Sequence, residues 1–271
     1  METEYIEKEN SKVTVIFVHG ILGSPARFKE LYDLVPDSFS IMKLVFDGHG
    51  KTTKEFHQSN IKKWRKQVHE SLLFLKSKKQ RIIYVGHSMG TLFGIEESIN
   101  GNLVDSLLLL NVPLKPHMTL AMFNRCIKVT FQNEKKFDDE TKLLKENCSI
   151  KLTKNVFAYL LWVPRYVELF KEMRHVKHLI PKISHPCICF HSKKDELVSQ
   201  KTYKYLKENP SIKIFYQENS THYYNGGEDL IVLKDEFLKL MEKYEKPSQP
   251  FQTEFMNELR KDMPFKKLNE D

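Results

Sequence analysis

Short, almost uninterrupted runs of apolar residues recur along the chain and are separated by helical patterns. Near-continuous hydrophobicity, rather than strict alternation, is typical of parallel strands that are covered on both faces. The pattern therefore predicts buried strands at residues 13–18, 41–46, 82–85, 107–110, 187–190 and 212–216.

The segments between these runs have the spacing of amphipathic helices. One of them places apolar residues three or four apart, at Ile61, Trp64, Val68, Leu72 and Leu75. Further helices are predicted after Ser24-Pro25, just after Ser88 and over residues 230–244. Strands that alternate with helices indicate βαβ units, so the fold class is α/β with a mostly parallel, doubly wound sheet.

Two stretches break this rhythm. Residues 114–183 contain no convincing strand and predict a helical cap inserted between late strands, so the core would comprise residues 1–113 and 184–245. Residues 246–271 form a basic C-terminal tail. Its apolar residues Phe251, Phe255 and Leu259 fall four apart and predict a short helix, which could dock on its own chain or on a partner.

Composition narrows the possible partners. The chain of 271 residues carries 43 Lys and Arg against 35 Asp and Glu, a net charge of +8, which suggests nucleic acid or an acidic membrane. However, only 7 of the basic residues are Arg, the residue whose planar fork grips phosphates and bases. A Lys excess spread along a chain is typical of a solvated surface, so we expect no nucleic-acid partner.

The N-terminus, the length of the apolar runs and the number of cysteines bear on the compartment and on possible cofactors. The charged N-terminus shows no secretory signal, and the apolar runs are too short to span a bilayer, so we expect a cytoplasmic protein without integral membrane contact. Four cysteines are too few for a disulfide scaffold. Cys187 and Cys189 could bind metal as a pair, but no second ligand pair stands at zinc spacing, and buried core thiols are the favoured interpretation. No metal or cofactor is predicted.

The strongest chemical signal is the segment Gly86-His87-Ser88-Met89-Gly90. It directly follows the strand predicted at 82–85 and opens a predicted helix, which is the context of a G-x-S-x-G nucleophile elbow. The glycines have a mechanical reason, because a side chain at either flank would collide with neighbouring backbone. Ser88 is therefore the candidate nucleophile, with an ordinary glycine-rich turn as the alternative.

Glycine is scarce elsewhere, and this scarcity points to a second loop. Seven of the ten glycines lie in three short segments, at Gly20, Gly23, Gly48, Gly50, Gly86, Gly90 and Gly94. The first segment follows the strand predicted at 13–18 with the pair His19-Gly20, which suits a loop whose N–H groups face a developing oxyanion. The expected donors are the amides of Ile21 and Met89, the latter at a helix N-terminus.

A nucleophilic serine needs a base, and the base needs an acid that orients it. In this architecture the acid and then the histidine follow the serine in the chain, each at the C-terminal end of a strand. Asp195 and His222 satisfy this order, and the segment between them has room for one helix and one strand. Glu196 is the alternative acid. His19, His49 and His87 are better interpreted as loop residues than as the base.

These motifs resemble those of the α/β hydrolases, and specifically of bacterial carboxylesterases and monoacylglycerol lipases. The resemblance covers residues 12–245 and rests on the segments 18–25, 47–50, 86–90, 194–198 and 220–222. It implies the α/β-hydrolase fold and an acyl pocket formed by the cap at 114–183. Two features depart from the family: Ile21 stands where an aromatic residue is common, and little chain precedes the first core strand.

The predicted function is hydrolysis of carboxylic esters through an acyl-enzyme, with Ser88, Asp195 and His222 as the triad. A thioesterase or an aromatic-acid esterase would use the same residues, and a ligand-binding protein without turnover could share the fold. The expected partner is a small-molecule ester with an apolar acyl group, which the apolar segment 156–162 suggests. The sequence predicts neither the acyl chain length nor the oligomeric state.

Overall fold

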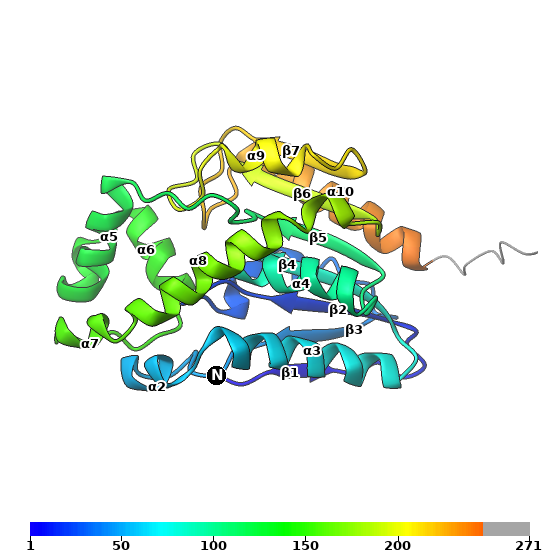
Figure 1. Cartoon of the computed structure of the whole chain (residues 1–271), viewed down its shortest axis with the longest axis horizontal. Helices are drawn as coiled ribbons and strands as arrows, with labels where there is room; N and C mark the ends of the chain where they lie inside the picture. The colour runs from blue at the N-terminus through cyan, green and yellow to red at the C-terminus, as the bar shows by residue number, and fades with distance from the viewer. Residues whose placement is uncertain (246–271) are drawn as a thin grey trace, which may run out of the picture.

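A computed structural model describes residues 1–245 of the chain. Its centre is a seven-stranded sheet in the order β1-β3-β2-β4-β5-β6-β7 (Figure 1). The strands are β1 (Glu4–Ile6), β2 (Val13–Val18), β3 (Ser40–Leu44), β4 (Arg81–His87), β5 (Ser106–Leu110), β6 (Cys187–Ser192) and β7 (Ile212–Gln217). Neighbouring strands run parallel except for β1, which is antiparallel to β3. The predicted mostly parallel sheet is therefore confirmed.

The six predicted strands coincide with β2 to β7 to within two residues at each end. Strand β2 shows why these runs are apolar at consecutive positions. Ile16 and Val18 face the core on one side of the sheet, and Val15 and Phe17 face the core on the other side. Each such side chain contributes about 1.5–3 kcal/mol when it is fully buried. β1 was not predicted, because three partly exposed residues are too few to show a pattern.

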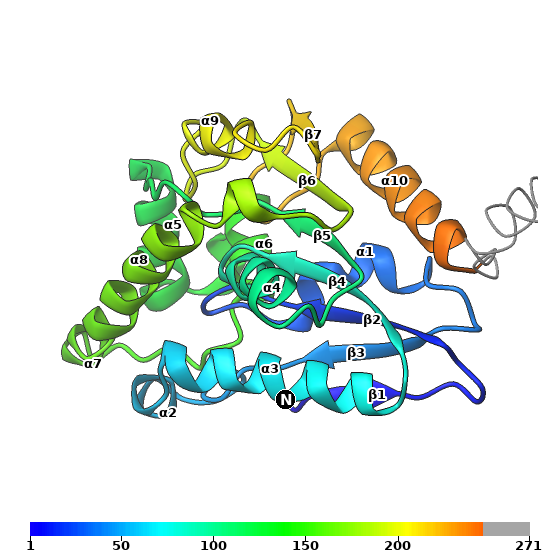
Figure 2. The ribbon, with the colours of Figure 1, turned by 45° about the vertical axis from the view of Figure 1, so that its right-hand side comes forward.

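Helices cover both faces of the sheet, which is the doubly wound arrangement (Figure 2). One face carries α3 (Ile61–Ser77), α4 (Met89–Asn100) and α8 (Val163–Lys177), and the other carries α1 (Lys29–Tyr32) and α10 (Gly227–Glu245). The remaining helices are η1 (Pro25–Phe28), α2 (Thr53–Gln58), α5 (Leu120–Phe131), η2 (Glu134–Lys136), α6 (Asp139–Asn147), α7 (Phe157–Leu160), η3 (Ile180–Lys182) and α9 (Thr202–Leu206).

Two helices differ from the sequence-based expectation. The helix after Ser24-Pro25 is shorter than its apolar spacing suggested, because η1 and α1 end at Tyr32. Val35 lies just before Pro36, and a proline disfavours helical backbone in the preceding residue. The short helix α2 was missed, although the Thr52 and Glu55 side chains form a capping box that the sequence displays as T-x-x-E.

The segment between β5 and β6 is helical, as expected, and comprises α5 to α8. In Figure 1 these helices gather at the end of the molecule opposite the C-terminal end of α10. The Trp162 indole donates a hydrogen bond to the Thr53 carbonyl at 3.2 Å, and Ser149 N donates to the Leu22 carbonyl at 2.8 Å. The segment is thus fastened to the loops at the C-terminal ends of β2 and β3.

Charge and hydrophobicity are both uneven over this segment. Residues 114–183 hold 14 Lys and Arg against 7 Asp and Glu, so nearly all of the net +8 lies there rather than being spread along the chain. The same helices expose large apolar side chains, among them Leu120 on α5 and Phe157 and Leu160 on α7, which are 82%, 72% and 64% exposed.

The structure also bears on the predictions for the cysteines and for membrane-spanning helices. Cys187 and Cys189 are buried in β6 in the same core, and burial raises the pKa of both thiols, so they are core residues. No helix within residues 1–245 is both long and apolar enough to cross a membrane. The helix predicted in the tail at 246–271 lies outside the described residues.

Candidate active site

Ser88 occupies the sharp turn between β4 and α4. Its backbone has φ 50° and ψ −124°, a left-handed conformation that non-glycine residues adopt rarely and at a cost of about 1–3 kcal/mol. Two hydrogen bonds hold the turn: Ser88 N donates to the Leu110 carbonyl at 2.9 Å, and the Thr91 hydroxyl donates to the Ser88 carbonyl at 2.6 Å. Ser88 as a whole is only 8% exposed.

The glycines around Ser88 permit three close approaches of backbone. A Cβ on Gly90 would collide with the Val18 carbonyl oxygen, because α4 begins against the end of β2. A Cβ on Gly86 would lie 3.0 Å from the Thr91 Cα atom. A Cβ on Gly20 would lie 2.8 Å from the Cβ of Ser88, so the loop after β2 passes directly beside the serine.

The two amides expected to face an oxyanion have no internal acceptor. Within residues 1–245, neither Ile21 N–H nor Met89 N–H donates a hydrogen bond to another group. Met89 N–H is a free donor at the start of α4, where the helix dipole favours negative charge. The Ile21 loop is fixed by the hydrogen bond from Ser149 N to the Leu22 carbonyl. Both donors therefore belong to rigid backbone beside Ser88.

Asp195 and His222 lie at the ends of β6 and β7 and are in contact. His222 Nδ1 and Asp195 Oδ2 are 2.8 Å apart, and both side chains are almost completely buried. The other carboxylate oxygen, Oδ1, accepts hydrogen bonds from Leu197 N at 2.8 Å and Val198 N at 2.7 Å. The carboxylate therefore fixes the orientation of the His222 ring through Nδ1 and leaves the second ring nitrogen, Nε2, without a contact to Asp195.

Ser88 is connected to His222 through its neighbour. His87 Nε2 lies 3.0 Å from the His222 carbonyl oxygen, and the centroids of the two rings are 4.8 Å apart. Within the described part of the chain no hydrogen bond joins Ser88 Oγ to the His222 ring. Such catalytic hydrogen bonds are often long without substrate and tighten in the substrate complex.

Glu196, the alternative acid, has a different position. One of its carboxylate oxygens pairs with Arg125 Nη1 at 2.8 Å, and the other accepts a hydrogen bond from His222 N at 3.1 Å. Glu196 therefore holds the backbone of the histidine, whereas Asp195 holds its ring. The geometry favours Asp195 as the residue that orients the imidazole.

The other histidines near the site are buried and neutral, His19 and His49 in loops and His87 as the last residue of β4. His19 Nε2 accepts a hydrogen bond from Phe46 N at 3.3 Å, so Nδ1 carries the proton and donates to the Gly20 carbonyl at 2.8 Å. Burial lowers the pKa of His19 to about 4. Burial also lowers the pKa values of His49 and His87 well below the ordinary value. None of the three has the carboxylate partner that His222 has.

These buried neutral histidines predict that the protein loses stability in mild acid. An unfolded chain takes up protons on them below about pH 6.5, while the folded protein does not until about pH 4 for His19. The free energy of unfolding is therefore highest above pH 6.5 and falls as the pH approaches 4, with His19 alone contributing about 3 kcal/mol.

Urea unfolding between about pH 7 and pH 4.5 measures this effect. His49→Phe, which removes one buried histidine from an aromatic cluster with Phe56 and Trp64, is expected to make the decline shallower. His178→Gln changes an exposed histidine and should leave the decline unchanged. If the free energy of unfolding stayed level or rose as the pH was lowered through this range, the interpretation of these histidines as buried and neutral would be wrong.

Sequence reasoning missed Asn111, which joins three parts of the site. It follows β5 with φ 54°, a conformation that asparagine tolerates better than most residues. Its side-chain nitrogen donates to the His222 carbonyl at 3.3 Å, and its oxygen accepts a hydrogen bond from Ser192 N at 3.1 Å. Its position directly after a buried strand was the available signal. No group of three or more metal-ligand residues comes together within residues 1–245.

Solved structures with this fold come from several hydrolases. One of the metagenome-derived lipolytic enzymes LipS and LipT is 16% identical to this chain, with a TM-score of 0.67 over 89% of this chain and 97% of that one. The monoglyceride lipase of Saccharomyces cerevisiae is 14% identical, with a TM-score of 0.62 over 89% and 91%. Est1E of Butyrivibrio proteoclasticus, solved with ferulic acid, is 18% identical, with a TM-score of 0.57 over 89% and 94%.

Comparison at the level of sequence gives the family. No curated protein matches the chain significantly. The family model described as serine aminopeptidase, S33, matches residues 9–227, which include both loops beside Ser88 as well as Asp195 and His222. The match covers most of the chain. The chain therefore belongs to the serine aminopeptidase S33 family of α/β hydrolases.

Proposed function

We propose that this protein is a serine hydrolase that cleaves carboxylic esters through an acyl-enzyme intermediate. The observation that carries the proposal is the buried pair of Asp195 and His222, 2.8 Å apart, beside the left-handed turn that presents Ser88. The names of the similar structures support an ester as substrate, since they include lipolytic enzymes and a monoglyceride lipase.

In the proposed mechanism the Ser88 hydroxyl attacks the ester carbonyl while His222 takes its proton. Asp195 keeps the imidazole in the required tautomer and stabilises the imidazolium that forms. The amides of Ile21 and Met89 donate to the tetrahedral oxyanion. The imidazolium then protonates the departing alcohol, and a water molecule activated by His222 releases the acid and restores Ser88.

The acyl group is proposed to lie beneath the helical cap at residues 114–183. A small apolar core formed by Met122, Val129, Phe137 and Leu144 packs against Leu197 and Tyr223. Leu197 lies two residues after Asp195, and Tyr223 directly follows His222. Apolar side chains of the cap thus reach the edge of the site. An apolar acyl chain would find its binding surface there.

A panel of substrates tests this proposal. We expect turnover of p-nitrophenyl esters and monoacylglycerols, with kcat/KM rising with acyl chain length until the pocket is filled. Acyl thioesters and amino-acid p-nitroanilides are the controls, because the family model is named for an aminopeptidase. Faster cleavage of the anilides than of every ester would contradict the proposal.

A further inference from the structure

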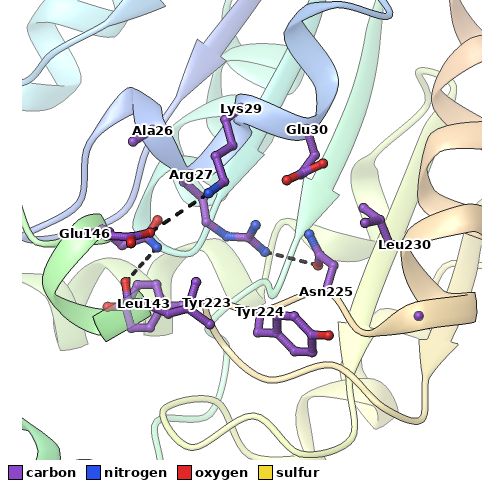
Figure 3. Close-up of a pocket in the computed structure, with 12 residues that line it drawn as sticks. Ala26, Arg27, Lys29, Glu30, Leu143, Glu146, Tyr223, Tyr224, Asn225 and Leu230 are labelled. Atoms are coloured by element: carbon purple, nitrogen blue, oxygen red, sulfur yellow. Dashed lines mark hydrogen bonds and ion pairs between the residues drawn. The ribbon is translucent and has the colours of Figure 1, made fainter. Parts of the chain in front are cut away.

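A cavity of about 260 Å³ lies beside the loop that follows His222 (Figure 3). Its walls are η1 and the start of α1, the C-terminal turn of α6, and the segment 223–230 that leads into α10. Ser88, Asp195 and His222 do not line it. The cavity is therefore a neighbouring space rather than the candidate catalytic centre itself.

Arg27 places a positive charge in the wall of this cavity. The residue is only 7% exposed, and its Nη2 atom donates to Asn225 Oδ1 at 3.2 Å. Its Nε atom is buried and has no hydrogen-bond partner within residues 1–245. Burial lowers the pKa of Arg27 to about 10, so the guanidinium remains charged at neutral pH.

Arg27 makes no ion pair with a carboxylate of residues 1–245, in contrast to three other arginines of the chain. Arg65, Arg125 and Arg165 each pair with a glutamate. No carboxylate of the described residues lies within ion-pair distance of Arg27. Burial lowers the pKa of Arg27, and the fields of Tyr223 and Asp195 oppose this effect without forming an ion pair. A buried charge with no directly paired counter-charge is costly, so this position is suited to one supplied by a ligand.

The acidic residues at the rim do not provide that counter-charge. Glu146 pairs with Lys29 at 3.9 Å (Figure 3), and Glu30 pairs with Lys234 at 3.2 Å. Both acidic side chains are therefore engaged with lysines and form no ion pair with Arg27. Asn147 Oδ1, on the α6 wall, is a second buried polar atom without a partner in the described chain and could accept a hydrogen bond.

We propose that this cavity binds the carboxylate of a small organic molecule, with Arg27 as the residue that recognises it. The planar guanidinium can offer a carboxylate two parallel hydrogen bonds. The volume is close to the lower end of ligand pockets, so the molecule is small. The carboxylate belongs either to a free acid or to the substrate, as an ester that also bears a free carboxylate.

Calorimetric titration with benzoate tests the site without turnover. Wild-type protein is expected to bind benzoate saturably and benzamide, its neutral analogue, at least about tenfold more weakly. Arg27→Met should weaken benzoate binding by a similar factor. Arg81→Met changes a half-buried arginine at the N-terminal end of β4 that does not line the cavity, and this variant should bind benzoate like wild type. Equal binding of benzoate and benzamide, or unchanged binding by Arg27→Met, overturns the proposal.

A second measurement needs no variant that might not fold. Arginine Nε–H resonances of wild-type protein are followed during a benzoate titration. One buried resonance should shift with the same dissociation constant that calorimetry gives. If the protein binds benzoate and no arginine resonance moves, the site is not Arg27.

A kinetic comparison identifies the source of the carboxylate, and this arm alone rests on the proposed function. If the carboxylate belongs to the substrate, wild-type protein cleaves monomethyl adipate with a higher kcat/KM than dimethyl adipate, and Arg27→Met loses the preference. If it belongs to a free acid, both esters react alike and benzoate still binds. A protein that cleaves no ester but binds benzoate through Arg27 would contradict the proposed function and leave the carboxylate site standing.

Discussion

Replacing Ser88 by alanine is expected to lower kcat for ester hydrolysis by about 10⁴-fold or more, because the attacking oxygen is lost. The residual rate would come from the amides of Ile21 and Met89 and from substrate binding alone. The fold should survive, since the strained backbone of the turn is held by the hydrogen bonds to Leu110 and from Thr91, which do not use the Ser88 side chain.

The matched control is Ser98→Ala in the same helix, α4. Ser98 is buried like Ser88, and its hydroxyl donates only to the Ile95 carbonyl at 2.7 Å. Its removal should change kcat by less than about twofold and cost about 1 kcal/mol of stability. Steady-state rates on one p-nitrophenyl ester, with thermal unfolding of each variant, separate the two effects. Equal rates for Ser88→Ala and wild type would remove Ser88 from the mechanism.

Asp195→Asn is expected to lower kcat by about 10⁴-fold with little change in KM. An asparagine of the same shape can present an N–H to His222 Nδ1, which would favour the wrong ring tautomer and leave Nε2 unable to take the serine proton. The asparagine oxygen can still accept the hydrogen bonds that Asp195 Oδ1 accepts from Leu197 N and Val198 N, so the fold should be largely retained.

Glu196→Gln tests the competing assignment of the acid. Glu196 contacts the backbone nitrogen of His222 and Arg125, so its amide variant should keep most of the activity and lose mainly the ion pair with Arg125. Measuring kcat and KM of both variants at one pH gives the comparison. If Glu196→Gln lost far more activity than Asp195→Asn, Glu196 would be the orienting acid.

The sequence could predict the sheet because burial leaves a local pattern. Strand β2 is covered on both faces, so its six residues are all apolar or small and stand out in the chain. The same locality explains why the motif around Ser88 was visible: its glycines are demanded by backbone contacts such as that of Gly90 with Val18. The three-residue strand β1 is too short to show a pattern of its own, and the short helix α2 shows only its capping box.

The candidate site was less predictable where it depends on contacts between distant segments. Asp195 and His222 could be placed by chain order at strand ends, and the structure brings them together. Asn111 could not be identified, because its role depends on reaching Ser192 and His222 from the end of β5. Arg27 gives no signal in the sequence, because its cavity is formed only when η1, α6 and the loop after His222 come together.

Labelling with a fluorophosphonate, followed by intact mass and peptide mapping, tests the central claim most directly. We expect one adduct per chain, located on Ser88, with loss of ester hydrolysis in proportion to labelling. Ser98→Ala should label like wild type, Ser88→Ala should not label, and Asp195→Asn should label more slowly. Folded, ester-active protein that formed no adduct, or that formed it on another residue, would contradict the account of Ser88 as the nucleophile.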